Sequence, residues 1–378
     1  MSRSFFALLI IPILLFNSLS AQSFFNTEGL GELTAGNITV SPCALSFHNP
    51  GAHIRLNKTI LGISLSGIGV IGRERNMTRA IGNVRPEAFY GAIPLPSRTR
   101  IIFNIDESFN QDFNIWTESL SDTTPRYHIQ SRGGIYSLNA GVAQSFLDHF
   151  CIGIQFQQQI GGSRENWHFH IGSAAISTDT IEIAYSASSA RIGATIQFNP
   201  IIFAVTYEPP KTITARRVRH IHGITGDSIR TYKLQLSHTL HLGTAINFLP
   251  QTQLNLGIDL YPWSDTKIDG FNAGYQNGVN GRVGIDHLLP SNHPLRLAYS
   301  RGRWYCPVKT TGGTIQEDAL TIGTSFPILH FGAIDLTGRI VSRKGNTPSG
   351  VLKETIGQLI ITLVYQETWG KRTRRWGY

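Results

Sequence analysis

Long hydrophobic runs are missing from most of this sequence. Beyond residue 21, no stretch approaches the ~20 consecutive apolar residues that a membrane-spanning helix requires. The first residues differ, because a single charge, Arg3, precedes an apolar run from Phe5 to Phe16, and small and polar residues follow up to Ala21. This order is typical of a secretory signal, and about twelve apolar residues are too few for a transmembrane anchor. We therefore predict that residues 1–21 are a signal peptide.

Cysteines are few and odd in number, at positions 43, 151 and 306. At most one disulfide could form, which excludes a disulfide-stapled scaffold. Acidic residues are also scarce, since 24 of them face 33 basic residues and leave a net charge of +9. In a cytoplasmic protein this balance would suggest nucleic acid. An exported chain meets anionic lipid and lipopolysaccharide instead, so we expect these partners and no nucleic acid.

The chain is rich in apolar and polar residues that alternate with a period of two. In the run 150–157 every even position is Phe or Ile, and the odd positions are Cys, Gly and Gln. The runs 101–106, 254–260 and 334–340 follow the same pattern over most of their length. The run 232–248 continues the alternation well beyond the five or six residues of a typical soluble strand. Strands of this length suit a tilted membrane crossing of roughly 9–11 residues with an extension beyond the bilayer.

The lengths of the connections alternate regularly along the chain. We expect strands near 58–72, 88–95, 99–109, 133–147, 149–160, 181–198, 201–208, 231–248, 252–262, 281–288, 294–303, 318–326, 330–343 and 354–367. Tight turns are expected at 96–98, 147–148, 199–200, 250–251, 290–294 and 327–329. Long polar connections are expected at 73–87, 110–132, 161–180, 209–230, 263–280, 304–317 and 344–353. Short turns that alternate with long loops are typical of outer-membrane barrels.

The predicted fold is therefore all-β: a transmembrane antiparallel β-barrel of about fourteen strands over residues 58–369, followed by a basic tail at 370–378. The barrel must close, because an open edge would leave backbone groups without hydrogen-bond partners in lipid. The first and last connections are both long, which places both termini on the short-turn, periplasmic side. Insertion would involve the barrel-assembly machinery, and a monomer is among the oligomeric states that the sequence allows.

The segment 22–57 lacks the alternation and is rich in Gly, Asn, Ser and Pro. It contains GLGE at 29–32, AGN at 35–37 and SPCALSFHNPGA at 41–52. This succession resembles the N-terminal hatch of the FadL-type outer-membrane transporters, in which Ala-Gly commonly follows Asn-Pro where this chain has Gly51-Ala52. The last predicted strand, which opens on Glu354 and is followed by Trp369 and the basic tail, resembles the same superfamily.

The resemblance implies a fourteen-strand barrel with a hatch at 22–57 inside its lumen, and it implies hatch or gating roles for Phe47, Asn49, Pro50, Gly51 and Ala52. It also implies passive uptake of hydrophobic small molecules such as long-chain fatty acids. A related branch with the same motif serves as a scaffold or shuttle in type IX secretion, and a general porin is a further alternative. An ordinary turn before a strand would also explain the Asn-Pro pair.

Several glycines that mostly fall on the polar side of the alternation could mark inward positions where a plug or ligand approaches the wall or where a strand bends, or could merely relieve crowding in the lumen. They are Gly141, Gly153, Gly193, Gly243, Gly257 and Gly323. The sequence shows no nucleophile–base signature, so we expect no enzymatic activity and no cofactor. The pairs His168-x-His170 and His220-x-His222 could bind a metal only with a third ligand, so we expect solvated loop histidines and no metal site.

Basic residues concentrate in the predicted long connection 209–230. Arg216, Arg217 and Arg219 are expected there to contact lipopolysaccharide phosphates, for which guanidinium geometry is suited. An ordinary solvated loop is the alternative.

Overall fold

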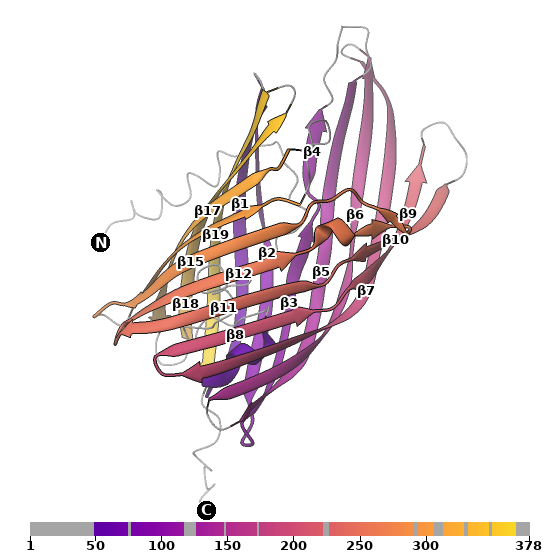
Figure 1. The fold of residues 1–378 in the computed structure, drawn as a ribbon. Coiled ribbons are helices and arrows are strands. Elements are labelled where there is room, and N and C mark those ends of the chain that lie inside the picture. The colour runs from indigo at the N-terminus through magenta and orange to yellow at the C-terminus, as the bar shows by residue number, and fades with distance from the viewer. Residues whose placement is uncertain are drawn as a thin grey trace, which may run out of the picture.

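The structure is a computed structural model that describes residues 49–74, 77–116, 126–146, 149–171, 174–221, 227–290, 293–305, 313–328, 332–347 and 350–367. The predicted signal peptide, residues 22–48 of the predicted hatch, Phe47 among them, and the basic tail lie outside the described residues. The described residues form a closed antiparallel barrel of long tilted strands (Figure 1). None of the helices in these ranges is long and apolar enough to cross a membrane.

Eleven wall strands run unbroken: β1 (Thr59–Glu74), β2 (Met77–Pro94), β5 (Arg126–Phe146), β6 (Phe150–Ile171), β7 (Ala174–Phe198), β12 (Thr252–Tyr261), β15 (Gly278–Leu288), β16 (Pro294–Arg303), β17 (Gln316–Ile328), β18 (Gly332–Thr347) and β19 (Gly350–Glu367). Three more are interrupted: β3 (Thr99–Asn110) with β4 (Phe113–Trp116), β8 (Ile201–Glu208) with β9 (Lys211–His220), and β10 (Ser228–Leu236) with β11 (Thr239–Leu249). The wall therefore has fourteen strands, and the predicted fold class and strand number are confirmed.

The barrel closes where its first strand pairs with its last. The ladder between β1 and β19 runs from Thr59 opposite Glu367 to Arg73 opposite Lys353. Thr59 also lies close to the tight turn between β2 and β3, because its neighbour Ile60 pairs with Ala92. Both ends of the barrel consequently lie at the tight-turn end, as the parity of the connections predicts.

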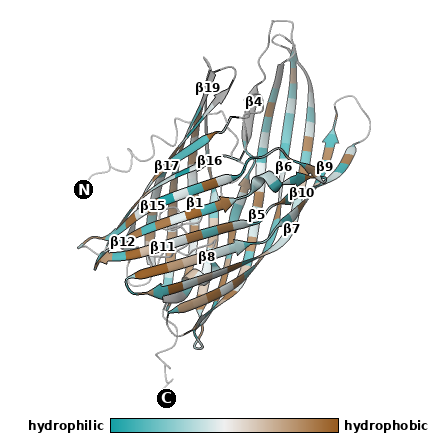
Figure 2. Cartoon of the chain, in the orientation of Figure 1, coloured by the Kyte–Doolittle hydropathy of each residue, from teal (hydrophilic) through white to brown (hydrophobic). Residues whose placement is uncertain are grey.

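The two faces of the wall differ in polarity, and the apolar face is the outer one. On β6, Ile154 and Phe156 are 51% and 55% exposed, whereas Gln155 and Gln157 are buried in the lumen. Figure 2 shows the resulting alternation of hydrophobic and hydrophilic residues along single strands. The apolar belt on β6 extends from Ile152 to Ile160, roughly 26 Å along the strand at ~3.3 Å per residue. This pattern is typical of a barrel whose outer surface faces lipid.

Four of the predicted long loops are mostly wall. The connections predicted at 73–87, 161–180, 209–230 and 344–353 are wrong over most of their length. β2 begins at Met77, β6 continues to Ile171 with β7 from Ala174, β9 and β10 fill much of 209–230, and β18 continues to Thr347 with β19 from Gly350. The physical reason is that these strand ends extend beyond the apolar belt, where the outer face is polar. On β9 the apolar side chains Ile213 and Ala215 lie on the inner face instead, so the alternation no longer marks a lipid-facing strand while the hydrogen-bonded ladder continues.

The connection between β12 and β15 contains short elements of its own. A 3-10 turn, η2 (Trp263–Asp265), is followed by the small hairpin β13 (Lys267–Ile268) and β14 (Phe271–Asn272). β13 pairs with β10, which fixes this connection against the wall. Trp263 is the buried residue of η2 and lies against the interior of the barrel.

Candidate functional site: the lumen and an opening in the wall

A short turn lies inside the barrel at its tight-turn end. It is the 3-10 element η1 (Pro50–Arg55), which directly precedes β1. The Asn49 side chain accepts a hydrogen bond from the Gly51 amide at 2.8 Å, and the Ala52 amide donates to the Asn49 carbonyl at 3.1 Å. Pro50, with its fixed φ, suits the first position of the turn. The Asn-Pro pair thus closes a compact turn by local hydrogen bonds.

This turn contacts the inner wall at two glycines. A Cβ atom at Gly153 would lie 2.5 Å from the carbonyl carbon of Pro50, and one at Gly193 would overlap the side chain of Asn49. A Cβ on Gly51 would in turn lie 2.6 Å from the carbonyl oxygen of Gly193. Of the six glycines at which a plug or ligand could approach the wall, Gly153 and Gly193 contact this turn. A Cβ on Gly141, Gly257 or Gly323 would meet wall residues instead. Gly51 fits the contact at Gly193 from the other side, which accounts for the order Gly-Ala here.

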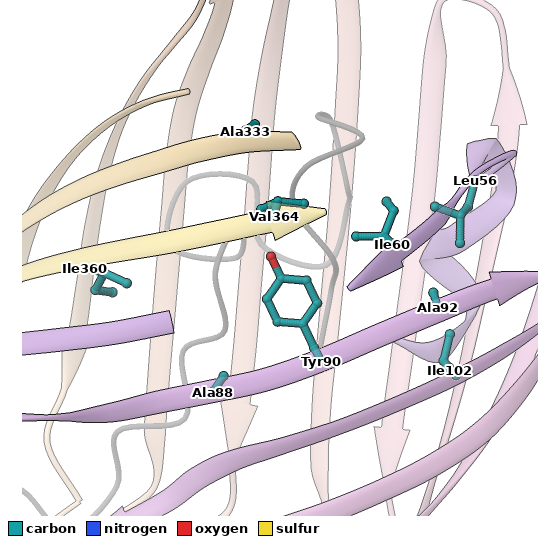
Figure 3. Close-up of a cluster of buried hydrophobic side chains, with 9 residues drawn as sticks. All are labelled: Leu56, Ile60, Ala88, Tyr90, Ala92, Ile102, Ala333, Ile360 and Val364. Carbon is teal, nitrogen blue, oxygen red and sulfur yellow. The ribbon is translucent and has the colours of Figure 1, made fainter. Parts of the chain in front are cut away.

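Polar contacts and an apolar cluster hold the ends of this segment. The Asn49 amide nitrogen donates to the hydroxyl of Thr195 at 3.4 Å, and Arg100 Nε donates to the carbonyl of Leu56 at 3.3 Å. Burial and the nearby Arg100 guanidinium lower the pKa of His53 to about 4, so its imidazole is neutral at pH 7. The Leu56 side chain joins a buried apolar cluster with wall residues that include Tyr90, which is directed toward β19 (Figure 3).

The described part of the lumen is lined by buried ion pairs between side chains of nearby wall strands. Arg191 binds Glu208 at 2.9 Å, and Arg296 binds Asp335; the side chains of all four are less than a tenth exposed. His241 and Arg282 both contact Asp259. A buried charge is tolerated only when it is paired and hydrogen-bonded. These pairs line the lumen from its tight-turn end, where Arg296 meets Asp335, to the far end of β12, where Asp259 lies.

The end of the lumen away from the tight turns contains an apolar cluster, and four of its nine buried members are aromatic. Its buried members come from distant strands and from η2: Phe109, Ile135, Tyr185, Ala187, Ile213, Ala215, Leu236, Trp263 and Tyr305. Trp263 and Tyr305 have ring centroids 5.7 Å apart, and Tyr275 meets Tyr305 edge-on at 5.2 Å. These separations lie in the range of favourable aromatic pairs. We call these nine residues the aromatic cluster.

The hydrogen-bond ladder of the wall is interrupted between β2 and β3. The two strands pair only from Ala88 opposite Asp106 to Pro94 opposite Arg100, although β2 continues in the other direction to Met77. Over that length the described part of β2 pairs with β1 alone. β3 itself ends at Asn110, and the wall resumes in β4 at Phe113. We call this interruption the wall opening.

Side chains instead of backbone groups span the wall opening. Arg85 binds Glu107 at 2.8 Å with both side chains almost fully buried, and Asn83 donates to Asp112 at 2.7 Å. On the outer face beside the opening, Val84 is 62% exposed. The opening therefore lies beside lipid-facing apolar surface and is bridged by contacts that can separate without breaking the strands.

The wall opening and the aromatic cluster are contiguous. Phe109 of β3 belongs to the cluster and stands at the edge of the opening. The Gln111 side chain, in the gap between β3 and β4, donates to the Tyr185 hydroxyl of the cluster at 2.9 Å. An apolar molecule held in the cluster would therefore be adjacent to a route through the wall into lipid.

The arginines predicted to act together lie on opposite faces of one strand. Arg216, Arg217 and Arg219 belong to β9, not to a loop. Arg216 is exposed on the outer face, whereas Arg219 is directed inward and binds Asp179 at 2.8 Å. Arg217 shares the inward parity of Arg219. The period of two in a strand separates them, so the set as predicted cannot form one surface.

The paired histidines are also wall residues. His168 and His170 lie on β6, and the ring of His168 is 5.6 Å from that of His128 on β5. Within the described ranges, no group of three or more His, Cys, Asp or Glu side chains is placed to hold a metal ion. His220 ends β9 and contacts Asp227, and His222 lies outside the described residues.

The wall opening and the aromatic cluster were not predicted from the sequence, although the wall opening has a local sequence signal. Pro86 lies in β2 beside the residues that do not pair with β3. Proline has no amide hydrogen to donate, so within a sheet it is confined to edges and irregular positions. The aromatic cluster left no local signal, because its members come from strands far apart in the chain.

No family model matches the sequence, and no curated protein matches it at a significant level. Solved structures do match. A FadL homologue of Pseudomonas aeruginosa is 12% identical, with 93% of this chain and 100% of that chain covered and a TM-score of 0.62. The Pseudomonas putida toluene transporter TodX is 13% identical (92% and 100% covered, TM-score 0.62), and the Ralstonia pickettii toluene transporter TbuX is 12% identical (91% and 100%, TM-score 0.56). The resemblance to FadL-type barrels is thus confirmed at the level of the fold.

Proposed function

We propose that this chain is an outer-membrane channel for the passive uptake of hydrophobic small molecules. The observation that carries the proposal is the contact between the aromatic cluster inside the lumen and the wall opening at Phe109 and Gln111. A general porin would need an open, charged lumen along its length. Here the half of the lumen away from the tight turns contains the aromatic cluster beside buried ion pairs such as Arg343 with Glu317, and the turn η1 occupies the tight-turn end.

The proposed route ends in the membrane. A molecule that enters from the side of the long connections would rest in the aromatic cluster, because contact with apolar surface removes it from water at about 25 cal/mol per Å². Deeper passage would meet the buried ion pairs and the turn at Asn49–Ala52, which offer no apolar surroundings. Lateral exit through the wall opening leads to lipid, which is the more favourable environment for such a molecule.

The class of substrate follows from the lining. Trp263, Tyr275 and Tyr305 present ring faces and edges that can pair with a flat ring. We therefore propose small aromatic hydrocarbons as the preferred cargo and long-chain fatty acids as weaker substrates. Similar barrels whose structures are solved include toluene transporters, which supports this order of substrate preference.

The N-terminal segment completes the proposal. Residues 22–57 would close the lumen at the tight-turn end as a hatch, and Asn49–Ala52 would be its docked end. With residues 1–21 removed on export, both termini would lie in the periplasm. The close fit of Gly51 against Gly193 supports docking of this end on the wall.

Substitution of the aromatic cluster tests the proposed function. Trp263→Ala combined with Tyr305→Ala is expected to lower the uptake rate of a radiolabelled aromatic hydrocarbon by roughly tenfold or more, because two apolar contact surfaces are lost. Phe203→Ala, which removes an exposed ring from the outer face of β8, is the matched control and is expected to leave uptake unchanged. Heat-modifiable migration in gels would verify that each variant is folded. Equal uptake by the double variant and the control would contradict the proposal.

A further inference from the structure

A basic hollow lies on the outer face of the wall, where the extended ends of β5, β6, β7 and β9 meet. Its volume is about 390 Å³, and Arg132, Arg164 and Arg216 surround it. Gly162 and Ala184 lie between these arginines. Because both residues are small, the three guanidinium groups border open space that a ligand group can enter.

The charges of this hollow are poorly balanced within the protein. Arg132 and Arg164 lie directly opposite each other on paired strands, an arrangement that destabilises a sheet when the charges are alike. Glu182 is the one carboxylate of the lining, and it lies 3.8 Å from Arg164 with both side chains at least half exposed, so it compensates weakly. Within the described ranges, neither Arg132 nor Arg216 forms an ion pair. Fold stability does not explain this concentration of charge, whereas binding of an anion does.

The level of the hollow on the wall points to a membrane headgroup. The apolar belt on the outer face of β6 ends at Ile160, and Arg164 follows four residues later, roughly 13 Å further along the strand. The hollow is therefore just beyond the hydrocarbon layer, at the end of the barrel opposite the tight turns. Arg217 and Arg219 are directed inward at this level and cannot contribute.

We propose that the hollow formed by Arg132, Arg164 and Arg216 binds a phosphate group of lipid A in the lipopolysaccharide of the outer leaflet. The proposal rests on the outer-membrane location contained in the proposed function, but not on uptake. Guanidinium groups bind phosphate in bidentate geometry, and three of them around one hollow neutralise a dianionic phosphomonoester. The acyl chains of the same lipid would lie along the apolar belt below.

The test measures binding of purified lipid A to the detergent-solubilised barrel by surface plasmon resonance. The triple variant Arg132→Gln, Arg164→Gln, Arg216→Gln is expected to bind lipid A bisphosphate roughly 100-fold more weakly than the wild type, if each arginine contributes about fivefold. The control variant Arg217→Gln, Arg301→Gln, Arg303→Gln removes the same number of charges elsewhere on the barrel. It is expected to bind like the wild type.

Four results would overturn the proposal: equal binding by the triple variant and the control, equal binding of dephosphorylated lipid A, equal binding of phosphatidylglycerol, or displacement of lipid A by millimolar inorganic phosphate alone. The third would assign the hollow to general anionic lipid, and the fourth would assign it to free phosphate. Uptake of hydrocarbon is measured separately. A barrel that binds lipid A through the arginines but transports nothing would contradict the proposed function and leave this site intact.

Discussion

A covalent bridge across the wall opening is expected to abolish uptake of hydrophobic molecules. Asn83 of β2 and Asp112, between β3 and β4, face each other across the opening at hydrogen-bond distance, 2.7 Å. With both replaced by Cys in a chain whose three native cysteines are changed to Ala, a short bifunctional thiosulfonate would join the two sides. Uptake of an aromatic hydrocarbon should then fall to the level of cells that lack the chain, and reductant should restore it.

A second cysteine pair provides the control for cross-linking itself. Gln158 of β6 and Ser188 of β7, which lie on the outer face, are likewise hydrogen-bonded, at 2.6 Å, but within an unbroken ladder. A bridge at Gln158→Cys and Ser188→Cys should leave uptake unchanged, because these strands have no opening to close. Full uptake with the first bridge in place would exclude lateral exit between β2 and β3.

Filling the two glycine sites is expected to displace the turn inside the barrel and raise leak conductance in planar bilayers. A methyl group at Gly153 meets the backbone of Pro50, and one at Gly193 meets the hydrogen-bonded side chain of Asn49. Overpacking of this kind costs about 1–3 kcal/mol at each site, which is comparable to the few hydrogen bonds that hold the turn. The double variant Gly153→Ala, Gly193→Ala should therefore conduct more than the wild type.

The control for this experiment is Gly257→Ala, on β12. A Cβ there finds its nearest neighbours at 3.7 Å, an ordinary van der Waals distance, and it does not meet the turn. This variant should conduct like the wild type. If the double variant were equally closed, the turn at Asn49–Ala52 would have no part in closing the lumen.

The barrel could be predicted because its governing constraints are local in sequence. Alternation in runs such as 150–157 distinguishes the outer from the inner face, and tight turns fix the order and number of the strands. The same alternation marked six glycines as candidate points of close approach, but it did not single out Gly153 and Gly193 among them. The partner in that approach, the turn at Asn49–Ala52, was predicted from a resemblance rather than from the residues.

The full strand lengths, the wall opening and the aromatic cluster could not be predicted, because they depend on how distant strands meet in the closed barrel. Strand ends beyond the apolar belt lack an apolar lipid-facing side, so β6 was expected to end too early, β9 was expected to be a loop, and Arg216 was grouped with two inward arginines. The wall opening arises where β2 continues without β3, and Pro86 was the one residue that indicated it. The aromatic cluster brings Phe109, Trp263 and Tyr305 together from three distant segments, which only the closed barrel does.

The most direct test of passive hydrophobic uptake compares two solutes of similar size, a radiolabelled aromatic hydrocarbon and a hydrophilic sugar. Their uptake is measured in cells that carry the intact chain and in matched cells that lack it. We expect the chain to accelerate entry of the hydrocarbon and to leave entry of the sugar unchanged. Acceleration of the sugar would show a general porin, and acceleration of neither would show a scaffold without transport, so either result would contradict the account.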